Sequence, residues 1–313
     1  MSDCLGIDTS CYTTSVSLIA EEGDLLADER IVLHVPPGHR GLSQSEMVYQ
    51  HVRNLPVLFS RLPHGFLKHT AGIGVSAFPR RRQDSYMPAF LAGRGTAEIL
   101  SLSAGIPLWT FSHQENHAMA AIREFPSLWG QDFYLLHLSG GTNDLLRVRW
   151  NGQAMDISEI TASEDITAGQ FIDRTGVALG LSFPAGAALE KMAECAAGSY
   201  RAPVSDSRAA FSFSGPETQV QKDILSGEYP AEEIAKGVLV SVSSAIKRVL
   251  TNQPLDKGMP FAAVGGVMSD RFLRDEMKEL LLSMGMEPHF ASPEYSSDNA
   301  SGNAFGASMM GKL

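Results

Sequence analysis

The first chemical signal in the sequence is a pair of histidines, His113 and His117, in the segment HQENH. On a helix, side chains four positions apart lie on one face, so both imidazoles can bind the same metal ion. Glu115 lies between them on another face, which is not where the base of a His-Glu-x-x-His protease stands. Solvated or helix-capping histidines have the same spacing, so a metal site needs a third ligand from elsewhere in the chain.

The candidate for this third ligand is Asp298, which lies in the segment SSDN directly before a predicted helix of small residues. Two imidazoles and one carboxylate leave coordination positions open for water or a substrate oxygen, as catalytic metal sites do. These ligand types suit iron or zinc. We therefore predict that His113, His117 and Asp298 hold one divalent metal, Fe or Zn.

Three turns of small residues each follow an apolar strand. They are Asp8-Thr9-Ser10, Ser139-Gly140-Gly141-Thr142 after Leu138, and Gly265-Gly266. Glycine turns expose backbone N–H groups and let a ligand approach the chain closely. Each turn alone is also a common hairpin tip, but three in one chain favour a phosphate cradle. None is a Walker loop, because no Gly-Lys-Ser/Thr follows.

Two charged segments have both a structural and a functional interpretation. Segment 164–174 places carboxylates, Asp173 among them, in a loop and at a helix start, where acidic residues are favoured without any function. The residues Pro184-Ala185-Gly186 are predicted to end the segment that follows. The run Arg80-Arg81-Arg82 is the strongest basic cluster. Such a run is usually a solvated loop, but in an acidic chain it is the best candidate for contact with a phosphate backbone.

Composition places the chain in a broad class. Its 313 residues suit two lobes of about 150 residues each. The chain has 44% hydrophobic and 19% charged residues, which argues against disorder. We find no membrane span and no secretory signal. The three cysteines, an odd number, suit a reducing compartment, and Cys11 is interpreted as a small packing residue. These features predict a cytoplasmic protein with no membrane partner.

The net charge of −10 also limits how nucleic acid can be bound. Neutralisation of phosphates dominates nucleic-acid affinity, so a protein that binds RNA alone is usually basic. An RNA partner must therefore meet a local basic patch or be recruited by another subunit.

The order of predicted elements indicates an α/β fold. Segments 4–20 and 133–150 both read as a strand, a small polar turn and a second strand, which suggests two related lobes. The remaining predicted elements are helices over 89–103, 231–250, 269–285 and 299–312, and strands over 107–111 and 261–267. Alternating strands and helices after an opening hairpin define the class as α/β.

Taken together and in order, these motifs resemble those of the threonylcarbamoyladenosine synthase catalytic subunit family, formerly named the O-sialoglycoprotein endopeptidase or glycoprotease family. The resemblance runs nearly end to end. It rests on GIDTSCYTTSVSL, HQENH, LSGGTNDLL, DITAGQFIDRTGVALGLSFPAGAALEKMA, FSFSGPETQV, VGGVMSDRFLR and SDNASGNAFGA. It implies the actin-like fold of sugar kinases and heat-shock chaperone ATPases, with nucleotide and metal in a cleft. The predicted lobes are 1–128 plus 297–313, and 129–296.

The resemblance also implies an activity and its participants. A threonylcarbamoyl group would pass from threonylcarbamoyl-AMP to the adenosine beside the tRNA anticodon. The implied cofactors are one divalent metal and an adenine nucleotide, threonylcarbamoyl-AMP or ATP. The implied partners are tRNA, a shorter paralogous scaffold subunit and a P-loop ATPase subunit. His113, His117 and Asp298 match the family's metal ligands. The positions that match its nucleotide and substrate contacts are Leu138, Ser139, Gly140, Gly141, Thr142, Asp173, Gly186 and Asp270.

The chain departs from the bacterial family at several positions. Tyr12-Thr13 replaces an Asp-Glu pair, Thr142 replaces His or Asn, and Asp270 replaces Asn. The segment AFPRRRQDSYMP stands in place of a Gly-Pro-Gly loop. A carboxylate at position 270 weakens adenylate binding unless it faces a ribose hydroxyl or is protonated.

Three functions therefore remain as alternatives. The first is the synthase itself. The second is a paralogue that binds nucleotide and serves as a scaffold for the active enzyme, which the change at Tyr12-Thr13 favours and the retained metal ligands oppose. The third is a metalloprotease, which lacks a positioned glutamate base.

Overall fold

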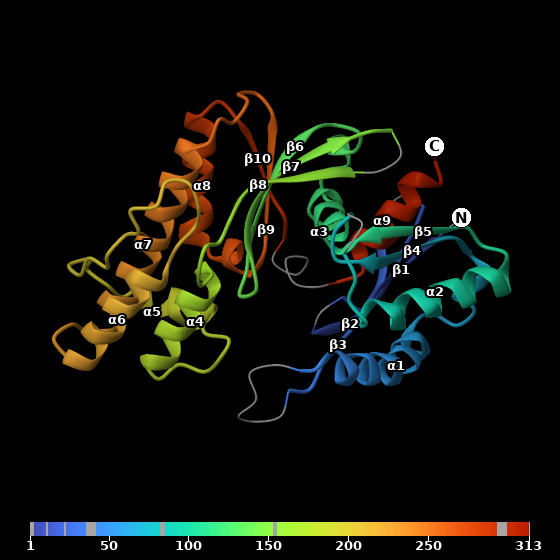
Figure 1. The fold of residues 1–313 in the computed structure, drawn as a ribbon, viewed down its shortest axis with the longest axis horizontal. Coiled ribbons are helices and arrows are strands. Elements are labelled where there is room, and N and C mark those ends of the chain that lie inside the picture. The colour runs from blue at the N-terminus through green and yellow to red at the C-terminus, as the bar shows by residue number, and fades with distance from the viewer. Residues whose placement is uncertain are drawn as a thin grey trace. The chain divides into compact units, whose positions relative to one another are not determined.

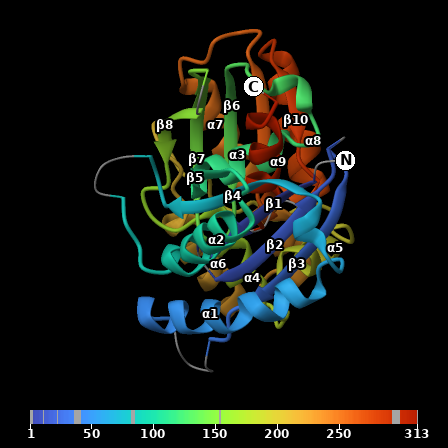
Figure 2. The ribbon, with the colours of Figure 1, turned by 90° about the vertical axis from the view of Figure 1, so that its right-hand side faces the viewer.

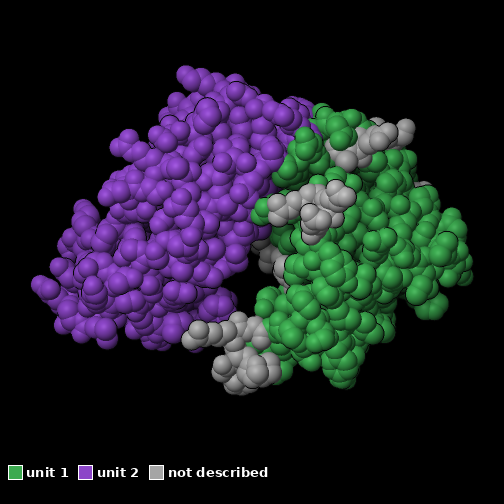
Figure 3. All heavy atoms as spheres, in the orientation of Figure 1, with its two compact units in different colours: residues 1–130, 150–157, 298–313 green, residues 131–149, 158–297 purple. Residues whose placement is uncertain are grey.

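The computed structural model describes residues 3–10, 12–21, 23–35, 42–81, 85–152, 155–292 and 299–312. The chain divides into two compact units, which Figure 3 distinguishes by colour. Unit 1 comprises Met1–Gly130, Trp150–Ile157 and Asp298–Leu313, and unit 2 comprises Gln131–Arg149 and Ser158–Ser297. The predicted lobes differ chiefly at 150–157, which the sequence assigned to the second lobe.

An aromatic cluster explains why Trp150 belongs to unit 1. Its ring lies 4.7 Å from that of Trp129, and Trp129 in turn meets the ring of Phe305 edge-on at 5.5 Å. Aromatic pairs in this range of centroid distances are favourable beyond the area that they bury.

Unit 1 is built on a sheet with the strand order β3-β2-β1-β4-β5. Neighbouring strands pair antiparallel from β1 to β2 and from β2 to β3, and parallel from β1 to β4 and from β4 to β5. The strands are β1 (Asp3–Asp8), β2 (Thr13–Ile19), β3 (Leu25–Val32), β4 (Thr70–Phe78) and β5 (Leu108–Ser112). The predicted hairpin over 4–20 and the short strand near 107–111 are confirmed.

Helices cover both faces of this sheet (Figure 1). Alternate strand residues point to opposite faces. Leu5 and Ile7 share one hydrophobic core with α1 (Gln44–Arg61) and α2 (Phe90–Ala104), so Gly6 faces the other side. There α9 (Ser301–Met310) passes so close that a Cβ atom on Gly6 would lie 2.1 Å from the carbonyl oxygen of Ala300. The helix α3 (His113–Ile122) packs against α9, and the short helices η1 (Phe66–Lys68) and η2 (Pro126–Leu128) lie in connections.

Unit 2 holds the second sheet, with the strand order β10-β9-β6-β7-β8. β6 and β7 form the second predicted hairpin, while β6–β9 and β9–β10 pair parallel. The strands are β6 (Phe133–Leu138), β7 (Asn143–Trp150), β8 (Met155–Ala162), β9 (Pro260–Val264) and β10 (Glu287–Phe290). The helices are α4 (Ala168–Ala178), α5 (Gly186–Ala193), α6 (Ser214–Ser226), α7 (Ala231–Asn252) and α8 (Arg271–Ser283), with the short η3 (Gly266–Ser269). Figure 2 shows the same ribbon turned by 90°.

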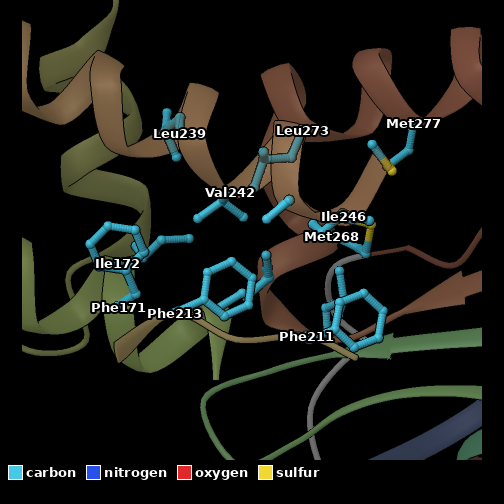
Figure 4. Packing of buried hydrophobic residues seen from close by; sticks show 14 of the residues in the cluster. Phe171, Ile172, Phe211, Phe213, Leu239, Val242, Ile246, Met268, Leu273 and Met277 are labelled. Carbon is cyan, nitrogen blue, oxygen red and sulfur yellow. The ribbon is translucent and has the colours of Figure 1, made fainter. Parts of the chain in front are cut away.

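The core of unit 2 lies around α7 (Figure 4). The apolar stripe predicted on this helix is fully buried, and Val242 and Ile246 pack with Phe171 of α4 and Leu273 of α8. The predicted helices over 231–250, 269–285 and 299–312 are confirmed, with ends that differ by a few residues.

Within the described ranges, no helix has both the length and the apolar character that crossing a membrane requires.

Candidate functional site

The histidine-bearing helix α3 begins at a reciprocal cap. The side chain of Ser112 accepts a hydrogen bond from the backbone N of Glu115, and the Glu115 carboxylate accepts one from the backbone N of Ser112 at 2.7 Å. This capping box fixes where the helix starts. Glu115 is also paired with Arg81, so both of its roles are structural. No protease base is therefore available at this residue.

The two histidines converge as the sequence predicted. Their Nε2 atoms are 3.0 Å apart, and His117 is buried. Two nitrogen ligands of a tetrahedral zinc ion, each bonded at ~2.0–2.1 Å, lie ~3.3 Å from each other. The imidazole pair therefore fits two positions of a metal site.

The third proposed ligand, Asp298, lies outside the described residues. Within the described part of the chain, no group of three His, Cys, Asp or Glu side chains is placed to hold a metal ion. The full three-ligand site stays a prediction.

The first small turn lies beside the histidines in unit 1. Oδ2 of the buried Asp8 is 3.6 Å from Nδ1 of His113, and its Oδ1 accepts from the backbone N of Ser10 at 2.8 Å. The hydroxyl of Thr9 bridges the carbonyl of Ala89 and the N–H of Gly93, so it anchors the start of α2. Among the described residues, no group hydrogen-bonds to the buried Oγ of Ser10. Of this turn, only Ser10 thus keeps an uncommitted polar group for a ligand.

Unit 2 contains a pocket of about 560 Å³. This size is in the range of small-molecule sites. Five residues predicted to contact nucleotide or substrate line it, namely Gly140, Asp173, Gly186, Gly266 and Asp270. The other predicted contacts of this unit, namely Leu138, Ser139, Gly141, Thr142 and Gly265, are not among its lining residues.

The glycines at the pocket keep space open. A Cβ atom on Gly140 would meet nothing nearer than Oδ2 of Asp173, at 4.0 Å, and one on Gly266 would meet nothing within 4 Å. Gly265 has another role, because its φ is +109° and a Cβ atom there would lie 2.1 Å from the carbonyl oxygen of Leu138. It therefore allows the chain to cross the end of β6 closely.

The second turn is held by its own serine. Oγ of Ser139 accepts hydrogen bonds from the backbone N of Gly141 at 3.2 Å and of Thr142 at 3.0 Å. Leu138 is a core residue at the end of β6. These side chains shape the turn rather than the pocket.

Asp173 ties the pocket wall together. Its Oδ1 accepts a hydrogen bond from the backbone N of Ala185 at 2.7 Å. Pro184-Ala185-Gly186 lies where the connection after α4 ends, because α5 begins at Gly186. The carboxylate of Asp173 holds the turn from which that helix starts.

Asp270 caps α8, a role that the sequence did not reveal. Its Oδ1 accepts a hydrogen bond from the backbone N of Leu273 at 2.9 Å. Burial raises the pKa of the Asp270 carboxyl to about 6, and the nearby Glu190 carboxylate adds to this effect, although the helix N–H groups oppose it. The pocket therefore carries an acid that is partly protonated near pH 6.

The other lining residues were not predicted as contacts, and Phe183 and Glu190 are two of them. The ring of Phe183 is 74% exposed at the pocket. Oε1 of Glu190 accepts a hydrogen bond from the backbone N of Arg271 at 2.9 Å. An aromatic residue before Pro-Ala-Gly was the only available signal for the first, and nothing marked the second.

Three other features singled out in the sequence are the basic run, Cys11 and the departure at Tyr12. In the basic run, the Arg81 guanidinium is bound to Glu115 and lies over the ring of Phe78, so it is not free for phosphate. Arg82 and Cys11 lie outside the described residues. The departure at Tyr12 places its hydroxyl 3.4 Å from the backbone N of Leu42.

Solved structures share this fold. The (R)-2-hydroxyglutaryl-CoA dehydratase component A of Acidaminococcus fermentans has a TM-score of 0.60 and 16% identity, over 100% of both chains. A ROK family glucokinase from Streptomyces griseus, in complex with glucose and AMPPNP, has a TM-score of 0.54 and 10% identity, also over 100% of both chains. At such identities the likeness concerns the fold alone, which is the two-lobed actin-like α/β fold.

Sequence relatives define the family. The tRNA N6-adenosine threonylcarbamoyltransferase of Carboxydothermus hydrogenoformans is 30% identical, over 95% of this chain and 88% of its own length. The family model for tRNA N6-adenosine threonylcarbamoyltransferase matches residues 86–305. This chain belongs to the tRNA N6-adenosine threonylcarbamoyltransferase family. The matched range contains both the histidine pair and all residues that line the pocket.

Proposed function

We propose that this protein is a transferase that modifies tRNA, moving a threonylcarbamoyl group from threonylcarbamoyl-AMP to N6 of the adenosine beside the anticodon. The observation that carries the proposal is membership of the family over residues 86–305. The converging imidazoles of His113 and His117 and the glycine-lined pocket of unit 2 support it, since the proposed chemistry needs a metal and a nucleotide.

We assign the adenine nucleotide to the pocket of unit 2. Three carboxylates line this pocket, those of Asp173, Glu190 and Asp270. A phosphate beside an unpaired carboxylate is repelled where water is excluded, whereas hydroxyl and amine groups donate to carboxylates. The ribose hydroxyls or the base amine therefore lie next to Asp270 and Glu190. Gly140 and Gly266, where side chains are absent, leave open space in the same pocket for the rest of the nucleotide.

The transfer itself follows from the donor. The N6 amine of the acceptor attacks the carbamoyl carbonyl carbon, a C–N bond forms, and the C–O bond to the phosphate of AMP breaks. AMP leaves and the amine loses its proton to water. The protein's share of this chemistry is to hold both reactants in place.

We propose that His113, His117 and Asp298 hold one divalent metal, iron or zinc. Such an ion supplies Lewis-acid polarisation and orients the reacting groups. The imidazoles would supply nitrogen ligands, and Asp8 lies beside Nδ1 of His113, the ring nitrogen that does not face His117.

The proposed partners are tRNA, a shorter paralogous scaffold subunit and a P-loop ATPase subunit, in the cytoplasm. The contacting helices α1 and α2 leave Tyr49, Val52, Ile99 and Leu102 exposed, which gives a subunit an apolar surface to cover. The acidic chain also needs help to retain tRNA, because its net charge is −10.

The direct test supplies unmodified tRNA and threonylcarbamoyl-AMP to the purified protein, with the two proposed subunits added in a second reaction. Chromatography of the digested tRNA should reveal threonylcarbamoyladenosine, and His117→Ala should abolish it. Absence of the product in both reactions, from a protein that binds metal and nucleotide, would overturn the proposed reaction.

A further inference from the structure

Asn116 lies between the two histidines on α3, and its side chain is almost completely buried. Its amide nitrogen donates to Oδ2 of Asp8 at 2.8 Å and to the carbonyl oxygen of Asn299 at 2.7 Å. Its amide oxygen accepts from the backbone N of Asn303 at 2.8 Å. The nitrogen faces two acceptors and the oxygen faces a donor, so only this amide orientation satisfies all three bonds.

These bonds join three parts of unit 1 that are distant in sequence. Asp8 ends β1 and Asn116 belongs to α3, while Asn299 lies just before α9 and Asn303 within it. Backbone packing fixes the same junction, since a Cβ atom on Gly302 would lie 2.0 Å from the carbonyl oxygen of Asn116. The segment around Asn299 therefore has one position along α3.

This junction involves residues that lie next to two of the proposed metal ligands. Oδ2 of Asp8, which accepts a hydrogen bond from Asn116, also lies 3.6 Å from Nδ1 of His113. Asn299 directly follows Asp298 in the chain, and consecutive Cα atoms are ~3.8 Å apart. Fixing the carbonyl of Asn299 to the histidine-bearing helix therefore limits where the carboxylate of the preceding residue can reach.

We propose that Asn116 is a positioning residue that sets metal affinity by fastening the chain next to Asp298, together with Asp8, to the helix that carries His113 and His117. The inference rests on the metal role given above to these ligands. Asn116 touches neither the metal nor the substrate in this role, and groups of this outer kind change metal affinity by ~10–100-fold when they are removed.

The test compares Asn116→Leu with Gln114→Leu. Leucine has the branching and the number of side-chain heavy atoms of asparagine, so the first variant removes the hydrogen bonds without adding charge. Gln114 lies on the same helix between the histidines, is half-buried, and its side chain takes no part in the junction. Asn116→Ser, a smaller perturbation, serves if the leucine variant does not fold. Chemical denaturation in chelator confirms that each apo protein folds.

Zinc affinity is measured by competition with a chromophoric chelator, and cobalt substitution reports ligand geometry by its visible spectrum. We expect ~10–100-fold weaker zinc binding and an altered cobalt spectrum for Asn116→Leu, with Gln114→Leu within about twofold of wild type. If the wild type binds zinc and the Asn116 variant binds it equally tightly, the inference about Asn116 is wrong while the proposed metal role stands. A wild type that binds no metal would overturn the proposed metal role as well.

Discussion

The carboxylate of Asp165 accepts a hydrogen bond from the backbone N of Phe213 at 2.8 Å and so ties the loop before α4 to the start of α6. The hydroxyl of Ser212 donates to the other carboxylate oxygen of Asp165 at 2.8 Å, and the ring of Phe213 lies 6.2 Å from that of Phe171 in the core, tilted by 32°. None of these residues lines the pocket. The motif FSFSG therefore acts here by holding two segments of unit 2 together.

Asp165→Ala should lower the free energy of unfolding by about 1–2 kcal/mol, because it removes a charged acceptor from several donors. Burial opposes ionisation, yet the hydrogen bonds from Ser214, Phe213 and Ser212 hold the pKa of Asp165 below its usual 3.8. A carboxyl whose pKa is lower in the folded state stabilises the protein at pH values above its unfolded-state pKa. This stabilisation is lost as the pH falls through the folded-state pKa. Urea denaturation should therefore show the full difference in free energy of unfolding between wild type and variant at pH 7, and this difference should narrow below about pH 3.8. The exposed neighbour Glu164→Ala is the control; an equal loss there would contradict the assignment.

Gly140→Val should abolish protection of the protein by adenine nucleotide. Valine fills the open space above residue 140, while the fold tolerates it because the nearest atom to its Cβ lies 4.0 Å away. Thermal denaturation with millimolar ATP, ADP and AMP measures the effect by mass action. Gly215→Val is the matched control, since Gly215 also has open space and lies outside the pocket lining. If nucleotide protects the Gly140→Val variant as fully as the wild type, the nucleotide does not bind in this pocket.

Asp270→Asn should stabilise the protein at neutral pH. Asparagine still caps α8, but it carries no buried charge. The pKa of Asp270 rises from 3.8 to about 6 on folding, so the folded state holds its proton between these values and loses stability as the pH rises through them. The free energy of unfolding of the variant should match that of the wild type near pH 4 and exceed it by about 1–2 kcal/mol at pH 8.

Chemical denaturation at pH 4.5, 6 and 8 measures this trend, and a gain independent of pH would show that ionisation of Asp270 is not its cause. Titration calorimetry with the same adenylate adds a second result. Unchanged affinity is expected if Asp270 faces a ribose hydroxyl, whereas tighter binding by the variant would place a phosphate beside the carboxylate.

Arg81→Ala should destabilise unit 1 by about 2 kcal/mol, because it leaves the Glu115 carboxylate, whose side chain is only 2% exposed, without its cation. Arg94→Ala is the control, since Arg94 and Glu98 form an exposed i,i+4 pair whose loss changes stability by a few tenths of a kcal/mol. Guanidinium denaturation compares the two. Equal changes would mean that the Arg81 pair is screened like any surface pair.

The elements that the sequence predicted well have local signatures. The hairpins follow from alternating residues around small turns, and the stripe on α7 follows from helical periodicity over five turns. The convergence of His113 and His117 is also local, because the helix itself sets their spacing.

What the sequence did not reveal depends on contacts between distant segments. The capping role of Asp270 was hidden because an N-cap is recognised only once the helix start is known, and the predicted helix began at 269, two residues before the observed start at Arg271. The bond from Ala185 to Asp173 joins residues twelve positions apart, and the pair of Arg81 with Glu115 joins residues thirty-four apart. No periodicity encodes such pairs.

The close crossing of α9 over Gly6 has a consequence for the order of synthesis. Met1–Gly130 leaves the ribosome before all of unit 2, whereas Ser301–Met310 follows it. Until that last segment emerges, one face of the first sheet and the inner side of α3 lack their neighbour. The bulk of unit 2 is contiguous and can condense during translation, as domains generally do. The packing around the helix that carries both histidines is therefore completed last, when the residues after 300 emerge.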